Sequence, residues 1–199
     1  MQDTQLTRIA VMLVLACWAA FGGVFFAGRR GRGRVERKRD RMSLVGMGLQ
    51  GVGYGLVFFL AGHAPPFSEF APPGSTAEAV LAIGTVLLAV ASVAIALTAA
   101  RALGAQWSFA ARVLANHHLI VRGPYRLVRH PIYTAMLGML WATSLAFATP
   151  LVLATATICC AAGTAVRIRS EERLLKETFG DEWIRYSSRV PAVLPGLRL

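Results

Sequence analysis

Long apolar runs separated by short polar stretches dominate the pattern of hydrophobic and polar positions along the chain. A helix needs about 20 mostly apolar residues to cross the hydrocarbon core of a bilayer. Runs at or near this length lie at 9–27, 43–62, 79–100, 132–148 and 151–166. The pattern therefore predicts an all-α fold, a polytopic membrane bundle of about five transmembrane helices.

The last two predicted spans are the shortest, and only Thr149 and Pro150 separate them. Such a short connection predicts a helical hairpin. The start of the fourth span and the end of the fifth then meet at the same membrane face. The second span carries glycines at five positions between 46 and 55. Small residues let membrane helices approach closely, so we expect this span to pack tightly against a neighbour.

The charged residues are few and unevenly placed. They make up 16% of the 199 residues, against about 25% in soluble domains. The net charge is +11, and 20 of the 21 Lys and Arg residues lie in 29–41, 101–131 and 167–199. Clusters beside apolar spans indicate topology and lipid contact rather than nucleic-acid binding. Basic loops mark the cytoplasmic side, so we expect the N-terminus outside and the C-terminus inside.

The division of the chain follows the spans. We expect three N-terminal transmembrane helices within 1–100, and a C-terminal region of two spans and a cytoplasmic tail within 101–199. The first apolar run is too long for the core of a signal peptide and is interpreted as a membrane anchor. Three cysteines lie in apolar stretches without metal-ligand spacing, so no metal site is expected.

One polar cluster precedes the fourth span. Gly123-Pro124 predicts a turn, and Pro131 suits the first position of a helix because its missing N–H has no helical partner there. His130 would then cap the helix, with Tyr133 one turn in on roughly the same face. Free N–H groups at this helix start would favour an anion such as a carboxylate.

A second polar cluster follows the fifth span. Arg167 and Glu171 are four residues apart and share one helix face. The predicted hairpin brings them to the first cluster, and ionisable residues at such a place are candidates for function. Taken singly, these residues also suit plainer interpretations, as interfacial aromatics, basic anchors or surface ion pairs. Those interpretations do not explain why His, Tyr, Arg and Glu converge at one edge.

The order and spacing of motifs over residues 101–195 resemble the isoprenylcysteine carboxyl methyltransferase family, which belongs with the membrane phospholipid methyltransferases. The motifs are Val121-Arg122-Gly123-Pro124-Tyr125, Arg129-His130-Pro131-Ile132-Tyr133, Glu171-Glu172-Arg173-Leu174-Leu175, Phe179-Gly180 and Trp183-Ile184-Arg185-Tyr186. Ala135 stands where such proteins often carry glycine. The resemblance implies a methyltransferase that binds S-adenosylmethionine in a cytoplasmic pocket and acts on a small lipophilic or lipid-linked acceptor.

The resemblance also implies the site residues. Arg167 would lie on the acceptor side, as the catalytic candidate. The implied cofactor residues are His117, His118, Leu119, Ile120, Tyr125, His130, Pro131, Ile132, Tyr133 and Glu171. Two alternatives remain open at this point. One is an NADPH-dependent membrane reductase of the sterol reductase type, which has a similar HPxY signature but usually with Asn where Ile132 stands. The other is a non-enzymatic assembly protein of a membrane complex.

Overall fold

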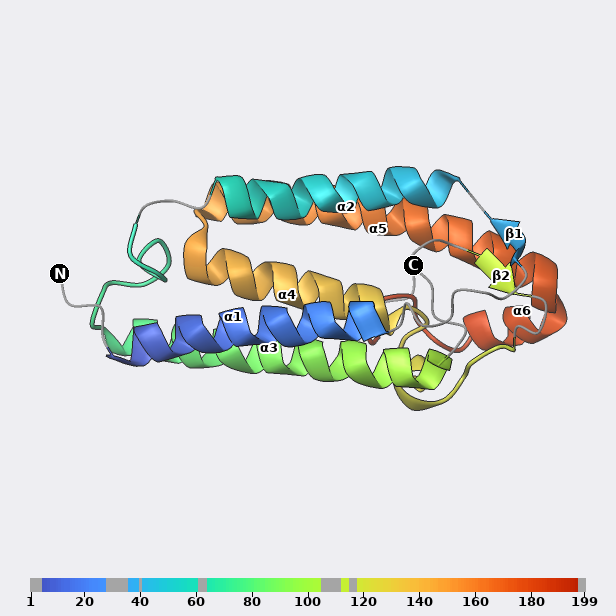
Figure 1. Cartoon of the computed structure of the whole chain (residues 1–199), viewed down its shortest axis with the longest axis horizontal. Helices are drawn as coiled ribbons and strands as arrows, with labels where there is room; N and C mark the ends of the chain where they lie inside the picture. Colours follow the sequence, from blue (N-terminus) through green and yellow to red (C-terminus); the bar gives the residue numbers. More distant parts are fainter. Residues whose placement is uncertain are drawn as a thin grey trace.

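Five long helices form the body of the molecule, as the computed structural model shows (Figure 1). The structure describes residues 5–27, 41–60, 64–104 and 118–196, and the backbone of 36–39 and 112–114. The long helices are α1 (Gln5–Ala27), α2 (Met42–Phe59), α3 (Thr76–Leu103), α4 (Pro131–Phe147) and α5 (Pro150–Phe179). The predicted all-α bundle is therefore confirmed.

The long helices have the length and composition of membrane spans. Four of them, α1, α2, α3 and α5, are long and apolar enough to cross a bilayer, whereas α4 is a shorter apolar helix of 17 residues. Helices suit this environment because they satisfy their backbone hydrogen bonds internally. Together with the apolar sequence, these helices make the chain an integral membrane protein.

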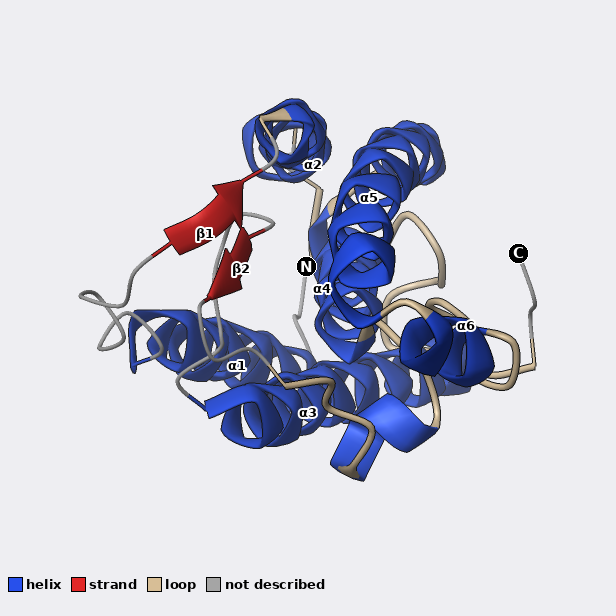
Figure 2. Ribbon diagram, turned by 90° about the vertical axis from the view of Figure 1, so that its right-hand side faces the viewer, coloured by secondary structure: helices blue, strands red, loops and turns tan. Residues whose placement is uncertain are grey.

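Helix α4 lies at the centre of the bundle. It contacts each of the other four long helices, and ten of its 17 residues are buried. Helix α2 runs along α5 on one side, and α3 runs along α4 and α1 on the other (Figure 2). The predicted turn between α4 and α5 is also present, because the Thr149 hydroxyl caps α5 by accepting from Val152 N, and Pro150 is the first helical residue. The more extensive partner of α5 is nevertheless α2.

The close packing predicted for the second span occurs at two of its glycines. A Cβ added at Gly46 would lie 2.6 Å from the carbonyl oxygen of Gly163, and one at Gly53 would lie 2.8 Å from that of Ala156. Cβ additions at Gly48 and Gly51 would meet nothing within 4 Å. Only the face of α2 turned toward α5 therefore requires glycine, and there the two backbones come close together.

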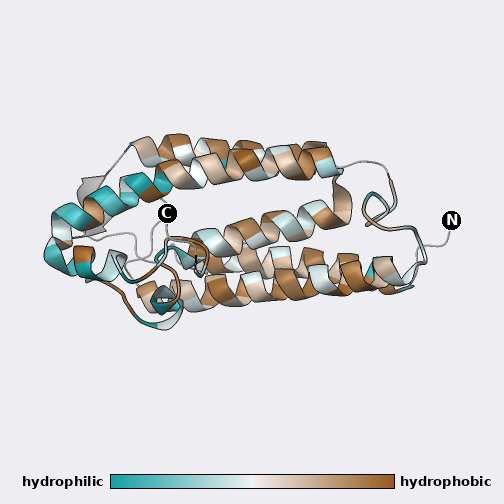
Figure 3. Cartoon of the chain, turned by 180° about the vertical axis from the view of Figure 1, so that it is seen from behind, coloured by the Kyte–Doolittle hydropathy of each residue, from teal (hydrophilic) through white to brown (hydrophobic). Residues whose placement is uncertain are grey.

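Helix α5 continues well past the apolar run at 151–166. Its 30 residues give a length of about 45 Å, against a hydrocarbon core of about 30 Å. Its charged end lies with helix α6 (Asp181–Ser187), the 3₁₀ turn η3 (Gly123–Arg126) and the antiparallel strands β1 (Glu36–Arg39) and β2 (Arg112–Leu114). Hydrophilic residues gather at this end of the molecule (Figure 3). The two-stranded ribbon was not predicted from the sequence.

Candidate active site

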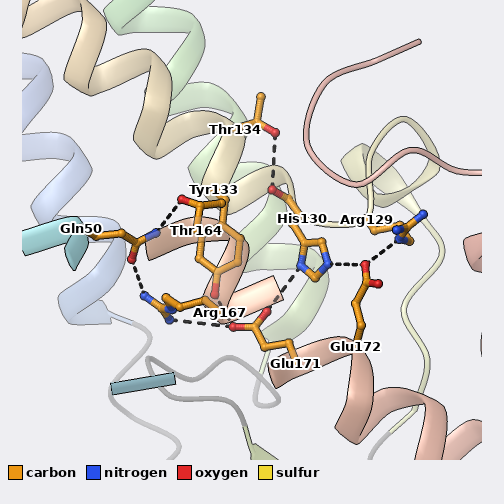
Figure 4. Close-up of polar contacts among 9 residues, drawn as sticks. All are labelled: Gln50, Arg129, His130, Tyr133, Thr134, Thr164, Arg167, Glu171 and Glu172. Carbon is orange, nitrogen blue, oxygen red and sulfur yellow. Dashed lines mark hydrogen bonds and ion pairs between the residues drawn. The ribbon is translucent and has the colours of Figure 1, made fainter. Parts of the chain in front are cut away.

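The start of α4 and the charged part of α5 meet at the hydrophilic end of the bundle (Figure 4). His130 is the residue before α4, Pro131 is its first residue, and Tyr133 follows within the first turn. The rings of His130 and Tyr133 stack with centroids 5.7 Å apart. Arg167 and Glu171 extend from α5 toward these rings. The convergence predicted from the hairpin is therefore present in the structure.

Glu171 is the shared acceptor of this cluster. The Tyr133 hydroxyl donates a hydrogen bond to Glu171 Oε1. His130 Nδ1 lies 3.4 Å from Glu171 Oε2, and Arg167 Nη2 lies 3.9 Å from Oε1. The Glu171 side chain keeps 25% of its surface exposed. It therefore holds three partners while a quarter of the side chain stays accessible.

His130 lies between two carboxylates. Its Nε2 is 3.0 Å from Glu172 Oε1, opposite the contact with Glu171. Burial alone would lower the pKa of His130, but the hydrogen bonds and negative charges of Glu171 and Glu172 outweigh burial and raise that pKa. A protonated imidazole donates through both nitrogens, which suits two acceptors. The arrangement thus favours a cationic His130.

Arg167 is a buried cation held from three helices. Arg167 is 6% exposed, and its Nη1 donates a 2.9 Å hydrogen bond to Gln50 Oε1 of α2. The guanidinium carbon lies 4.9 Å from the centroid of the Tyr133 ring, within the range of a cation–π contact. Contacts from α2, α4 and α5 thus fix the position of its charge.

Arg129 joins the site to the C-terminal segment. Its Nε donates to Glu172 over 2.9 Å, and its Nη1 donates to the carbonyl oxygens of Ser187 and Val190. Backbone hydrogen bonds continue the attachment, from Arg129 N to Pro191 O and from His130 N to Ala192 O. The segment after α6 is therefore bound to the residues that begin α4.

The residues that the resemblance implies do not all join the polar cluster. Tyr125 is buried in η3, where its carbonyl accepts a 2.7 Å hydrogen bond from the Tyr186 hydroxyl. Burial, and then the charge of Glu171, raise the pKa of Tyr125. His118 is exposed, and Leu119 and Ile120 are half-buried. His117 lies outside the described residues.

The free N–H groups expected at the start of α4 are mostly engaged. Pro131 has none, and those of Tyr133 and Thr134 donate to the carbonyl oxygen of His130 over 3.0 and 3.2 Å. The expectation of several free donors is therefore wrong, because the backbone of His130 already satisfies this helix end. Of the first helical N–H groups, only that of Ile132 is not engaged by this carbonyl.

Three residues of the cluster were missed in the sequence analysis: Gln50, Arg129 and Glu172. Each carried some signal. Gln50 is a polar residue in an otherwise apolar span, which marks a functional candidate. Arg129 and Glu172 stand directly beside predicted site residues within the quoted motifs. Their partners could not be read from spacing, because Arg129 and Glu172 are 43 positions apart and Gln50 and Arg167 are 117 apart.

An apolar groove lies between the other ends of α4 and α5. Its volume is about 480 Å³, and its lining includes Trp141, Leu145, Leu153 and Ile158. Thr157 on this lining accepts a hydrogen bond from Trp141 Nε1 over 3.1 Å. The residues that line this groove include no ionisable side chain.

Known proteins match the part of the chain that contains this cluster. The phospholipid methyltransferase family matches residues 79–182, which include His130, Tyr133, Arg167 and Glu171. Protein-S-isoprenylcysteine O-methyltransferase B of Arabidopsis thaliana is 31% identical over 80 residues, 40% of this chain and 41% of that protein.

Two bacterial proteins are also similar to part of the chain. Methanethiol S-methyltransferase of Pseudomonas deceptionensis is 40% identical over 75 residues, 37% of this chain and 27% of that protein. The cobalt-zinc-cadmium resistance protein CzcN of Cupriavidus metallidurans is 39% identical over 89 residues, 42% of this chain and 38% of that protein. The match thus spans about two-fifths or less of each relative's length.

These matches do not favour a reductase or a non-enzymatic assembly protein, since the family and most of these relatives are named as methyltransferases. The family match covers more than half of the chain and contains the polar cluster at the junction of α4 and α5. The chain belongs to the phospholipid methyltransferase family.

Proposed function

We propose that the chain is a membrane methyltransferase that takes its methyl group from S-adenosylmethionine and transfers it to a small lipophilic acceptor. The observation that carries the proposal is the cluster of His130, Tyr133, Arg167 and Glu171 at one end of a membrane bundle, within the family match. The proposed orientation has this end, with the C-terminus, on the cytoplasmic side and the N-terminus outside.

The polar groups of the cluster fit S-adenosylmethionine, which carries an ammonium, a carboxylate and a ribose diol. Glu171 and Glu172 keep 25% and 24% of their side chains exposed, so either carboxylate can hold the ammonium or the diol. Both nitrogens of the cationic His130 face these two acids, so His130 holds them in place, and its positive charge favours a carboxylate nearby. S-adenosylmethionine would supply a methyl group on a sulfonium: an electron pair of the acceptor would bond to the methyl carbon as the carbon–sulfur bond breaks and S-adenosylhomocysteine leaves.

The remaining cofactor residues are proposed from the resemblance. Tyr125 is buried next to the charge of Glu171, which puts it close to the cluster. Its role stays a proposal, as do those of the other residues implied along the same segment. These are His117, His118, Leu119, Ile120, Pro131 and Ile132.

The protonation of the cluster favours an acceptor that is already an anion. A His130 that carries its proton between two carboxylates has no lone pair with which to accept another. Arg167 is a fixed, buried cation suited to orient an anionic head group. A carboxylate or thiolate needs no general base for methylation, whereas an ammonium must first lose a proton. The relatives named for isoprenylcysteine and methanethiol are consistent with this acceptor class.

Binding of S-adenosylhomocysteine to the purified protein, measured by calorimetry in detergent, tests the cofactor assignment directly. We expect the wild type to bind, and Glu171→Gln to lose at least about tenfold in affinity because it removes a charge-assisted acceptor. Glu182→Gln is the matched control, since Glu182 is an exposed carboxylate on α6. No binding by the wild type, or equal binding by Glu171→Gln, would contradict the proposal.

Transfer of a labelled methyl group from S-adenosylmethionine then identifies the acceptor. Lipid and thiol extracts of the host are incubated with the protein, and the labelled product is tested for loss of its methyl group in mild base. An ester loses the label, whereas a thioether or a methylated amine keeps it. We expect an ester or a thioether, and a labelled amine would contradict the anionic acceptor class.

A further inference from the structure

A single glutamine in the middle of α2 reaches into the polar cluster. Gln50 is 2% exposed and lies in a helix whose other residues are almost all apolar or glycine. It stands eight residues after Met42, or about 12 Å along the helix. Its Oε1 accepts from Arg167 Nη1 over 2.9 Å, and its Nε2 donates to Thr164 Oγ1 over 2.9 Å (Figure 4). Both the oxygen and the nitrogen of the amide therefore have a hydrogen-bond partner.

The chemistry of these partners fixes the orientation of the amide. A guanidinium has only donors, so Gln50 must present its oxygen to Arg167. The amide nitrogen then needs an acceptor, and the hydroxyl oxygen of Thr164 lies one turn before Arg167 on the same helix. Gln50 consequently bridges two successive turns of α5 and holds the guanidinium relative to the helix that bears it.

Close packing of α2 against α5 brings the amide within reach. A Cβ at Gly46 would lie 3.2 Å from Arg167 N and would also meet the Cγ of Arg167. A Cβ at Gly163 would lie 2.8 Å from Gln50 N. The aliphatic part of the Arg167 side chain therefore packs against α2 at Gly46. Its guanidinium reaches Gln50, which lies one helical turn further along α2.

The other described neighbours of the Arg167 charge do not replace this contact. The Tyr133 ring covers the guanidinium at 4.9 Å, and Glu171 Oε1 is 3.9 Å from Nη2. The Gln50 hydrogen bond is shorter than the ion pair and directional. Gln50 also lies outside residues 79–182, which match the family. The N-terminal part of the chain thus contributes to the geometry of a site whose residues on α4 and α5 lie within the family match.

We propose that Gln50 is a positioning residue, which aims the Arg167 guanidinium at the anionic group of the acceptor. The inference rests on the proposed function for the role of Arg167, and on the hydrogen bonds alone for the link between Gln50 and Arg167. It extends the site from the α4–α5 junction to α2, so α2 and α5 together form the acceptor side.

Kinetics of two substitutions at Gln50 test the proposal, in protein reconstituted with S-adenosylmethionine and N-acetyl-S-farnesylcysteine as a lipophilic carboxylate. Gln50→Met keeps the volume but loses the acceptor, and we expect kcat/KM to fall about 10- to 100-fold because the cation is misplaced. Gln50→Glu keeps an oxygen facing Arg167 but neutralises its charge. We expect this variant to retain kcat within about threefold and to raise KM, as for loss of uniform binding.

Two further readouts separate positioning from a general structural role. Affinity for S-adenosylhomocysteine should stay within about twofold in both variants, since Gln50 contacts neither His130 nor Glu171. Thr143→Val is the matched control, because it removes another buried contact between helices, the 2.8 Å hydrogen bond from Trp18. We expect it to lower Tm without the loss of kcat/KM. Two outcomes would overturn the proposal. In one, the kcat/KM of Gln50→Met is no lower than that of Thr143→Val. In the other, Gln50→Met loses only affinity for S-adenosylhomocysteine.

A double-substitution cycle keeps the inference distinct from the proposed function. If Gln50 acts through Arg167, the losses of Tm in Gln50→Met and Arg167→Met are not additive, and the double variant unfolds within about 2 °C of the less stable single variant. Additive losses of Tm would show that Gln50 does not act through Arg167. This cycle needs no turnover, so it stands even if the wild type transfers no methyl group and the proposed function fails.

Discussion

At the scale of single residues, the structure predicts that the imidazole of His130 makes the stability of the protein depend on pH. Burial would lower its pKa, and the contacts with Glu171 and Glu172 raise it above the ordinary value of about 6.5. A group whose pKa is raised by folding stabilises the folded state fully below its unfolded value. That contribution is lost as the pH rises through the folded value. We therefore expect Tm to fall as the pH rises above the ordinary value of about 6.5.

The comparison with His130→Gln isolates this effect. Glutamine can still donate a hydrogen bond to one carboxylate but does not titrate, so the fall of Tm over the same pH range should be smaller in the variant. Thermal unfolding in detergent, followed by differential scanning fluorimetry, measures both curves. Parallel curves for the two proteins would mean that the neighbouring carboxylates do not raise the pKa of His130.

Single residues were predictable where the chain itself brings them together. Arg167 and Glu171 share a helix face through their spacing, and His130 and Tyr133 through the helix start at Pro131. The hairpin then joined these two pairs. Gln50 could not be found in this way, because its contact with Arg167 depends on how α2 is placed against α5. No local pattern in the sequence encodes that placement.

At the scale of helices, the contact between α2 and α5 gives the sharpest prediction. In Gly163→Ala, the added Cβ would lie 2.8 Å from the backbone nitrogen of Gln50 and would also crowd the carbonyl of Gly46. Backbone atoms cannot turn aside as a flexible side chain can, so the two helices must separate. We expect a loss of about 1–3 kcal/mol in stability, as for other overpacked cores. Separation should also stretch the Gln50–Arg167 hydrogen bond.

Gly51→Ala is the control for this substitution. Gly51 lies next to Gln50 on α2, but its Cβ would meet nothing within 4 Å, and alanine favours helix more than glycine does. We expect an unchanged or slightly higher Tm for Gly51→Ala. Thermal unfolding of the two variants beside the wild type measures the difference. Equal values of Tm for Gly163→Ala and Gly51→Ala would contradict the close approach of the two helices.

Hydropathy predicted the existence of the helices better than their ends. The run at 151–166 marks the apolar part of α5, whereas the helix continues to Phe179 through charged residues. Hydropathy reports where lipid is the solvent, and a helix can extend beyond that region with its backbone still bonded internally. The pairing of β1 with β2 joins residues 73 to 78 positions apart in sequence, with Arg39 opposite Arg112 and Glu36 opposite Leu114, so local patterns could not predict it.

At the scale of the whole molecule, the short α4 and the long α5 together set the depth of the site. Both helices begin or end at the same tight turn around Thr149. Helix α4 covers about 25 Å from that turn, whereas α5 covers about 45 Å. The start of α4 therefore lies near one edge of the hydrocarbon core, with the charged part of α5 beyond it. Under the proposed function, a polar cofactor would reach a site at this depth from water, and a lipophilic acceptor would reach it from the membrane.

The proposed orientation predicts which residues a membrane-impermeant thiol reagent reaches in intact cells. Cys17, Cys159 and Cys160 lie in the membrane helices, so their replacement by alanine gives a background without thiols. A cysteine at exposed Glu69, between α2 and α3, should then react from outside. One at exposed Lys176, in the charged part of α5, should react only after the cells are opened.

This pair of positions decides the orientation because the two lie at opposite ends of the bundle. Helix α2 ends and α3 begins on the side of Glu69, and α5 begins on that side and runs to the hydrophilic end, where Lys176 lies. Basic residues close to Lys176 in the sequence, such as Arg169, Arg173 and Arg185, favour the cytoplasmic face, since such residues are retained there during insertion. The reverse labelling pattern would put the methyl-transfer site outside the cell. S-adenosylmethionine made in the cytoplasm could not then reach it, so that outcome would contradict the proposed function together with the orientation.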